Sequence, residues 1–326
     1  MNAYFVIVLL GVILFFVVWI LGWVLERLSH ITLDTARAPG SRAWYMLVGP
    51  GVALHESAHA LGCLFTGTEI VEFKPLHVKT VGDEVVLGFV KYRNPSSVLK
   101  RTVINLAPVA LSLALLILFA LGVTYLVPAA TGIGGQALQL LEDLIYLKSN
   151  SAILNDPIYP IVEISGFVYS FFYTFAGLTV IHPLFWMVAF LAMTIMFSNA
   201  PSDVDVSNAL PGLRLILVFD ALWLIIAYIY PQAGWVLFGL FELLAVMYAL
   251  AIALSILAYG FFIMITGMAK LKTPFNLIPF IVTIVSGFLL NISEIGTPAL
   301  QTVISVGIFV LVLIPLLFVK EIRAVR

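Results

Sequence analysis

The sequence predicts an all-α polytopic membrane protein with a small β-hairpin between its second and third membrane spans. Hydrophobic residues make up 62% of the 326 residues and charged residues only 10%, a balance that a water-soluble domain cannot solvate. Several apolar stretches reach the roughly 20 residues that a helix needs to cross about 30 Å of hydrocarbon. We expect about eight transmembrane helices, near residues 3–25, 43–65, 102–127, 180–200, 213–230, 241–265, 275–291 and 301–319.

Residues 66–101 form the most polar stretch between two predicted spans, and they are rich in charged side chains. Such a stretch belongs outside the hydrocarbon or at its edge. Within it, residues 69–74 and 84–93 are rich in β-branched and aromatic side chains, and Gly82 and Asp83 between them are typical of a turn. We therefore expect a small β-hairpin in this segment.

Residues 161–181 are apolar enough for a further span, but small and polar residues interrupt them at helical spacing. The interruptions give a helix one polar stripe, formed by Glu163, Gly166, Ser170, Tyr173 and Gly177. A helix of this kind lies along the membrane interface or faces a cavity. We favour that interpretation, and a full span is the alternative.

The distribution of lysine and arginine orients the predicted spans, because short cytoplasmic loops accumulate these residues. With eight spans and both termini inside, four of the 16 cationic side chains fall outside, namely Arg27, Arg37, Arg42 and Lys148. The inner side holds the other twelve, which are Lys74, Lys79, Lys91, Arg93, Lys100, Arg101, Arg214, Lys270, Lys272, Lys320, Arg323 and Arg326. The sequence therefore predicts that the hairpin faces the cytoplasm.

The charge and the cysteine content of the chain bear on nucleic-acid binding and on disulfide bonds. The net charge is −1 and no run of lysine or arginine forms a basic patch, so we expect no nucleic-acid partner. The lone cysteine, Cys63, permits no internal disulfide. The partner that the composition implies is the lipid bilayer.

The strongest local motif is His55-Glu56-Ser57-Ala58-His59, which falls in the predicted second span. Residues four apart on a helix differ by about 40° in rotation and about 6 Å in rise, so both imidazoles point to one side and can share a metal ion. Zinc is the expected ion, because neutral imidazole is a good zinc ligand and a hydrolytic site needs no redox change. Glu56 then lies where its carboxylate can take a proton from zinc-bound water.

Two histidines leave one protein ligand to find. Residues 197–212 carry Asp203 and Asp205 after a hydrophobic helix that a proline terminates, and unwound backbone at membrane depth is tolerated where it lines a cavity. We prefer Asp205 as the third ligand because it starts a new turn, and we interpret Asp203 as a cap or a hydrogen-bond partner. The histidines that we interpret as surface or capping residues are His30, His77 and His182.

A His-Glu-x-x-His motif in one span, followed by an Asn-x-Pro-like helix break with aspartate, resembles the site-2 protease family of intramembrane zinc proteases. The resemblance covers roughly residues 43–212, although the Leu-Asp-Gly that usually follows the proline is absent. It implies an active site on the cytoplasmic side and a β-structured segment after the motif helix. The residues that it assigns are His55, His59 and Asp205 or Asp203 as zinc ligands and Glu56 as the general base.

The resemblance also divides the chain into three parts. We expect an N-terminal span and outer loop in residues 1–42, a site-2-protease-like catalytic core in 43–212 with the hairpin at 66–101, and C-terminal membrane helices in 213–326.

The function that we expect is that of an enzyme, an intramembrane zinc endopeptidase acting on membrane-protein or peptide substrates. A sheet edge in the hairpin, near residues 68–93, can hold such a substrate in extended form. One alternative is a membrane protein without protease activity that keeps the motif as a structural or regulatory metal site. Another is a secondary transporter that uses Asp220 and Glu242, two acids in predicted spans.

Overall fold

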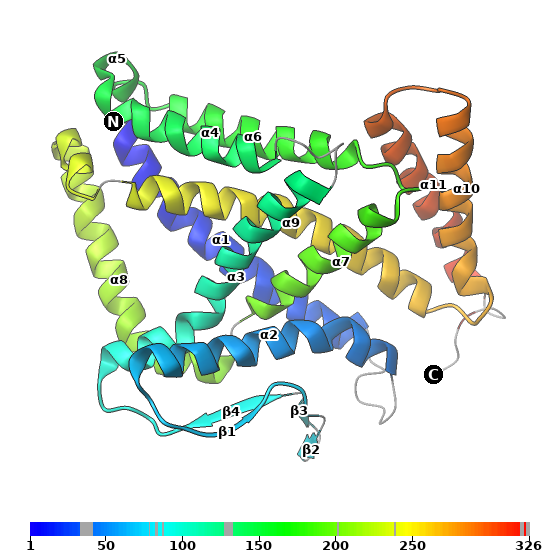
Figure 1. The fold of residues 1–326 in the computed structure, drawn as a ribbon, viewed down its shortest axis with the longest axis horizontal. Coiled ribbons are helices and arrows are strands. Elements are labelled where there is room, and N and C mark those ends of the chain that lie inside the picture. The colour runs from blue at the N-terminus through cyan, green and yellow to red at the C-terminus, as the bar shows by residue number, and fades with distance from the viewer. Residues whose placement is uncertain are drawn as a thin grey trace.

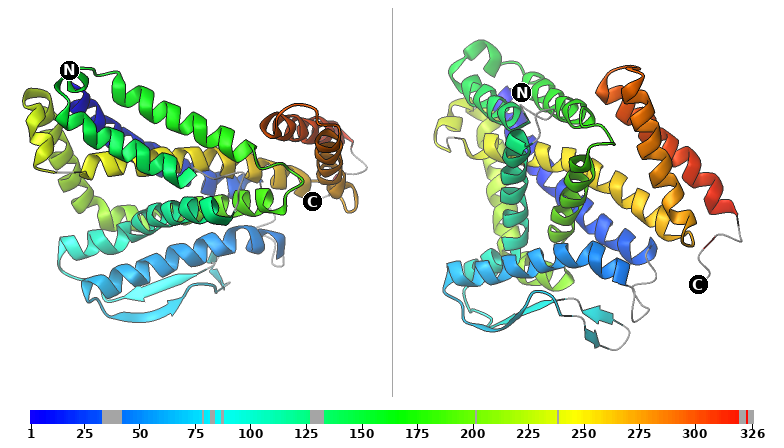
Figure 2. Two further views of the ribbon diagram at one scale, coloured as in Figure 1. Left: turned by 45° about the horizontal axis from the view of Figure 1, so that its top comes forward. Right: turned by 45° about the vertical axis from the view of Figure 1, so that its right-hand side comes forward.

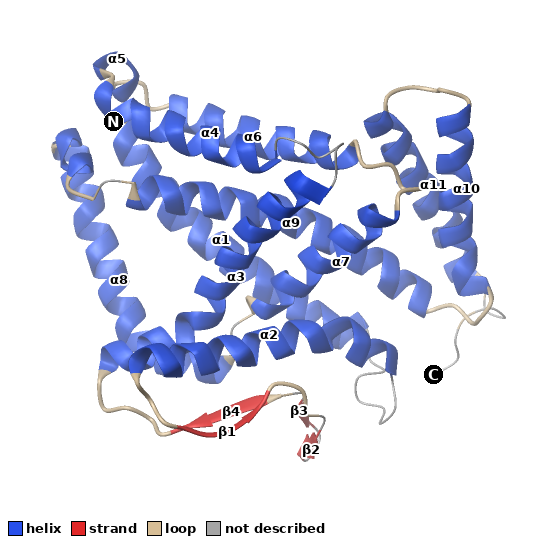
Figure 3. Cartoon of the chain, in the orientation of Figure 1, coloured by secondary structure: helices blue, strands red, loops and turns tan. Residues whose placement is uncertain are grey.

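The protein is helical apart from one small β region (Figures 1 and 3). The computed structural model describes residues 1–32, 42–77, 79–81, 84–86, 88–126, 133–200, 202–237, 239–319 and 323. The long helices are α1 (Ala3–Thr32), α2 (Arg42–Thr66), α3 (Val98–Leu126), α4 (Ile133–Tyr146), α6 (Tyr159–Ala176), α7 (Pro183–Ser198), α8 (Asp203–Ile229), α9 (Leu240–Ala269), α10 (Ile278–Ile292) and α11 (Pro298–Phe318). The short helical segments are η3 (Leu147–Ser149), α5 (Ser151–Leu154), η4 (Pro231–Trp235) and η5 (Phe275–Leu277).

Among the described residues, six helical segments are long and apolar enough to cross a membrane. They are Ala3–Leu28 of α1, Val98–Phe119 of α3, Val204–Ile229 of α8, Leu240–Ala269 of α9, Phe275–Ile292 of η5 and α10, and Pro298–Phe318 of α11. These helices, together with the composition of the chain, indicate a multi-pass membrane protein, as the sequence predicts.

Two of the predicted spans form helices that are not among these six. Residues 43–65 fall in α2 and residues 180–200 in α7. α7 has only 16 residues, because Pro183 begins it and Asn199 is its C-cap, and a straight crossing needs roughly 20. The predicted number of eight spans therefore stays a prediction.

The segment 161–181, for which two interpretations are open, lies mostly in α6. The helix buries one apolar face, made by Ile164, Phe167, Phe171 and Phe175. α6 is not among the six candidate spans, and it runs beside α4 along one side of the molecule (Figures 1 and 2). Its exposed side also carries Ile161, Val162 and Tyr169, so both interpretations of this segment stay open.

The predicted hairpin region contains two antiparallel ladders. β1 (Ile70–Lys74) pairs with β4 (Phe89–Tyr92), and β2 (Lys79–Val81) pairs with β3 (Glu84–Val86). The predicted turn at residues 82–83 lies outside the described residues. The β1–β4 ladder lies along the outer side of α2 (Figure 1).

The core of the molecule surrounds α1 and α9, which pack along each other in the middle of the fold (Figure 1). Their buried apolar side chains join those of α3, α4, α6 and α7 in one cluster. α2 packs against α3 and α7 at one end of this core, whereas α4 and α6 cover the opposite end (Figure 1). The His-Glu-x-x-His motif therefore lies on the side of the molecule that carries the β region.

Two glycines allow α2 to approach its neighbours closely. A Cβ atom at Gly51 would lie 2.6 Å from the Cβ of Phe197 and 2.9 Å from the carbonyl oxygen of Thr194, both in α7. A Cβ atom at Gly62 would lie 2.9 Å from the Cα of Ile104 in α3. Small residues permit such backbone contacts between membrane helices. α2 is thereby held between α7 and α3, about one turn on either side of its two histidines.

Candidate metal centre

His55, His59 and Asp205 lie together where α2 meets the start of α8. The Nε2 atoms of the two histidines are 3.0 Å apart, and Asp205 places Oδ2 at 3.2 Å from His55 Nε2 and Oδ1 at 3.1 Å from His59 Nε2. Two ligand atoms at about 2.0–2.1 Å from a tetrahedral ion are roughly 3.3 Å apart. The separation of the two Nε2 atoms and the shortest carboxylate contact of each histidine are close to this spacing, and one ligand atom from each residue lies within 4.8 Å of the other two. The side chains are 11%, 7% and 9% exposed, in the same residue order.

The second nitrogen of each imidazole faces a backbone carbonyl. His55 Nδ1 is 2.9 Å from the carbonyl oxygen of Ser198, and His59 Nδ1 is 2.9 Å from that of Ile104. Because a carbonyl oxygen only accepts hydrogen bonds, Nδ1 carries a hydrogen, and a neutral ring in this tautomer turns an Nε2 lone pair toward Asp205. With both rings neutral, the two Nε2 atoms and the two Asp205 oxygens converge as acceptors. Among the described residues, they form the one group of histidine, cysteine and acidic side chains with metal-binding geometry.

Asp205 reaches the histidines because α8 begins beside them. Ser202 is the N-cap of α8, and its side chain accepts the backbone N–H of Asp205, the third residue of the helix. Sequence reasoning missed Ser202, although a Ser-x-x-Asp spacing before a helical segment is the pattern of a capping box. It also missed the carbonyls of Ser198 and Ile104, for which no sequence pattern exists.

Glu56 lies between the candidate ligands and the β region. Its side chain is partly buried, and it interacts electrostatically with all three candidate ligands and with the backbone N–H of Val90 in β4. A Cβ atom at Gly88 would lie 3.1 Å from the Cγ of Glu56 and 2.5 Å from the carbonyl oxygen of Pro75. Gly88 therefore lets the chain that enters β4 pass close to Glu56.

The β1–β4 ladder has one charged face and one face turned toward α3. On the charged face, the Glu72 carboxylate lies 2.8 Å from the ammonium groups of Lys74 and Lys91, and these groups lower the pKa of Glu72 to about 2. On the other face, Tyr92 donates a hydrogen bond of 3.3 Å to Asn105 Oδ1 in α3, and burial raises the pKa of Tyr92. The ladder is thus held beside the candidate metal centre with its ion pairs facing outward.

The remaining histidines and Asp203 are not part of the group formed by His55, His59 and Asp205, or their side chains lie outside the described residues. His182 is the N-cap of α7, and its ring accepts a backbone N–H, which confirms its prediction as a surface or capping histidine. The ring of His77 lies 6.1 Å from that of Phe89, edge to face. The side chains of His30 and Asp203 lie outside the described residues.

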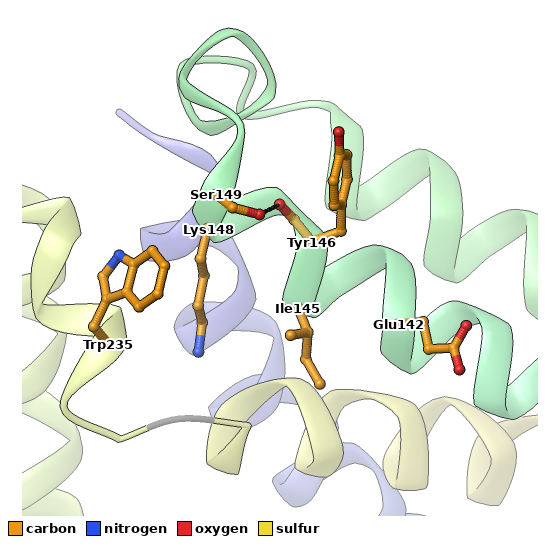
Figure 4. A pocket seen from close by; sticks show the side chains of 6 residues that line it. All are labelled: Glu142, Ile145, Tyr146, Lys148, Ser149 and Trp235. Carbon is orange, nitrogen blue, oxygen red and sulfur yellow. Dashed lines mark hydrogen bonds between the residues drawn. The ribbon is translucent and has the colours of Figure 1, made fainter.

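The two acids considered for transport do not belong to the metal-binding group. Glu242 is fully buried, and its carboxylate lies 2.5 Å from the ammonium group of Lys148. Lys148 also lines a cavity of about 420 Å³ together with Glu142, Trp235 and their neighbours (Figure 4). Asp220 is partly buried in α8. The ammonium group of Lys148 thus balances the buried carboxylate of Glu242.

An apolar cavity of about 440 Å³ lies between α2, α3 and α8. Two of its lining residues are neighbours of His59 in α2: Ala58 directly precedes His59, and Gly62 follows His59 by about one helical turn. The residues that line it are Ala58, Leu61, Gly62, Phe65, Thr102, Val103, Leu106, Ala107, Ala110, Leu111 and Ile216. A cavity of this size and lining suits apolar side chains of a ligand.

The region thus combines three side chains that could hold a metal ion, a carboxylate beside them, a β-ladder and an apolar cavity. Its His₂Asp group can hold a metal ion. Comparisons of the chain with protein-family models, curated proteins and solved structures found no match.

Proposed function

We propose that this membrane protein is an intramembrane zinc metalloprotease of the site-2 protease type. The convergence of the ligand atoms of His55, His59 and Asp205 carries the proposal, because two neutral imidazole nitrogens and a carboxylate suit a cation. Glu56, which directly follows the first histidine, lies beside the group. The resemblance of the His-Glu-x-x-His motif and the later aspartate to that protease family is the second support.

Zinc suits this set of donors. Two imidazole nitrogens and one carboxylate oxygen supply three ligands, which leaves one position of a tetrahedral ion open, as in hydrolytic zinc sites. When bound, zinc supplies Lewis-acid chemistry, since it lowers the pKa of a coordinated water and polarises a carbonyl oxygen. The carbonyls of Ser198 and Ile104 hold the two imidazoles in the tautomer that ligates a metal.

Glu56 is the general base in this proposal. Its carboxylate accepts a proton from the attacking water and returns a proton to the amine that leaves. Glu56 does not have to hold the ion for this role, so its chemistry can be separated from metal binding by mutation.

The proposed substrates are membrane-protein segments or peptides that reach the site in an extended form. A substrate helix must unwind before its carbonyl is exposed, and a strand edge of the β1–β4 ladder can pair with the unwound chain. Val90 brings β4 next to Glu56. The apolar cavity lined by Ala58 and Gly62 can receive apolar side chains of the substrate. From the charge asymmetry, we place the site toward the cytoplasm.

Peptide cleavage by the zinc-loaded, full-length protein in detergent tests this function. The probe is a library of fluorogenic peptides with apolar centres. Glu56→Gln is nearly isosteric but removes the basic oxygen, so cleavage should fall at least about a hundredfold, within the roughly 10²–10⁴ of general-base catalysis. Its zinc content should equal that of the wild type. Glu142→Gln, the same change on the exposed side of α4, should leave cleavage unchanged.

Cleavage by Glu56→Gln at the wild-type rate would refute the role of Glu56. A wild-type protein that binds zinc but cleaves no peptide in the library would refute the protease, and would support the alternative of a metal site without proteolysis.

A further inference from the structure

The helix α8 begins with a capping box that contains one of the candidate ligands. Ser202 Oγ accepts the backbone N–H of Asp205 at 3.1 Å and donates to Asp205 Oδ2 at 2.6 Å. The backbone N–H of Ser202 donates to the same oxygen at 2.9 Å. Asp205 Oδ2 therefore receives two hydrogen bonds from Ser202 while it lies 3.2 Å from His55 Nε2.

These hydrogen bonds restrict the rotation of the Asp205 side chain. With Oδ2 held by Ser202, Oδ1 is turned to His59 Nε2 at 3.1 Å. A ligand that is already fixed in its binding orientation loses less conformational entropy when the ion binds, so fixing it raises metal affinity. The same serine thus both begins the helix and orients the carboxylate.

We infer that Ser202 is a positioning residue whose hydroxyl holds Asp205 in the orientation that binds the metal. The inference rests on the proposed metal site. Removal of a hydrogen-bond partner from a metal ligand typically costs about 10–100-fold in metal affinity. The expected effect is in this range and not a complete loss, because the backbone N–H of Ser202 keeps its bond to Asp205 Oδ2 in any variant.

Zinc dissociation constants of the full-length protein, measured by competition with a chromophoric chelator, test this role. Ser202→Ala and Ser202→Gly both remove the hydroxyl, but glycine is itself a favourable N-cap residue and so preserves the start of the helix. Both variants should bind zinc about 10–100-fold more weakly than the wild type. Ser202→Thr keeps the hydroxyl, and it should restore wild-type affinity.

A second N-cap provides the matched control. Thr297 caps α11, and its side chain accepts the N–H of Leu300 at 3.3 Å. Thr297→Ala removes a cap of the same kind from a helix that carries none of the candidate ligands, so its zinc affinity should equal that of the wild type.

Wild-type zinc affinity in both Ser202→Ala and Ser202→Gly would overturn the inference, and so would an equal loss of affinity in Thr297→Ala. These results differ from a failure of the proposed function. If the wild-type protein bound no zinc, the metal site itself would be refuted, whereas tight binding by the wild type and both Ser202 variants would refute only the role of Ser202.

Discussion

Asp205 completes the three-residue group that could hold a metal ion, because its two oxygens each face the Nε2 atom of one histidine of α2. We expect Asp205→Ala to lose bound zinc, since two imidazoles alone leave a site with too few protein ligands. Asp203→Ala should keep its zinc. Metal analysis of both purified variants after dialysis checks this, and loss of zinc from Asp203→Ala alone would move the third ligand by two residues.

At the residue scale, spacing alone could predict the motif histidines and the glutamate between them, because residues four apart share one face of a helix. The preference for Asp205 over Asp203 came from its place at the start of a turn, and the structure brings Asp205 to both histidines. The carbonyl partners at Ser198 and Ile104 could not be predicted. Backbone acceptors are present at every residue, so packing between helices decides which of them meets a histidine.

At the scale of elements, the position of α2 between α3 and α7 depends on its glycines. Gly62→Ala would place a Cβ atom 2.9 Å from the Cα of Ile104, which pushes α3 away and disturbs the carbonyl that holds His59. We expect a loss of about 1–3 kcal/mol in stability, typical of overpacking, and weaker zinc binding. Thermal unfolding and chelator competition measure these two effects.

Gly122→Ala in α3 is the control for Gly62→Ala. A Cβ atom there meets nothing within 4 Å, so the change should leave zinc affinity unaltered and stabilise the helix by up to about 1 kcal/mol. If Gly62→Ala behaved like Gly122→Ala, the close contact between α2 and α3 would not be what positions the histidines.

Strands and helices could be predicted where their sequence pattern is local. The β-rich segments 69–74 and 84–93 appear as paired strands, because β-branched and aromatic residues suit a half-buried ladder. The ends of helices were harder to predict. The predicted span 213–230 begins about ten residues after α8 does, because Ser202 caps this helix and Asp203 is its first residue.

At the scale of the whole molecule, the charge asymmetry predicts that the β region faces the cytoplasm. Lys91 in β4 has a side chain that is 63% exposed, so Lys91→Cys in a Cys63→Ala background should react with a membrane-impermeant maleimide from the cytoplasmic side only. Ser149→Cys, which follows the one outer lysine, should react from the opposite side only. Reaction of Lys91→Cys from outside would contradict the predicted orientation.

The membrane class of the whole chain could be predicted from composition, because long apolar helices leave few alternatives. The number of spans could not be fixed in the same way. α2 carries the polar motif and α7 is short, so length and hydropathy do not identify either one as a crossing helix. The candidate metal-binding group joins residues 150 positions apart, and only the packing of α2 against the start of α8 brings them together.

X-ray absorption at the zinc K-edge of the zinc-loaded wild-type protein tests the metal centre most directly. We predict one zinc per chain, with two imidazole nitrogens and additional oxygen ligands at about 2.0–2.1 Å. A spectrum without two histidine ligands, or a protein that takes up no zinc, would contradict the proposed centre.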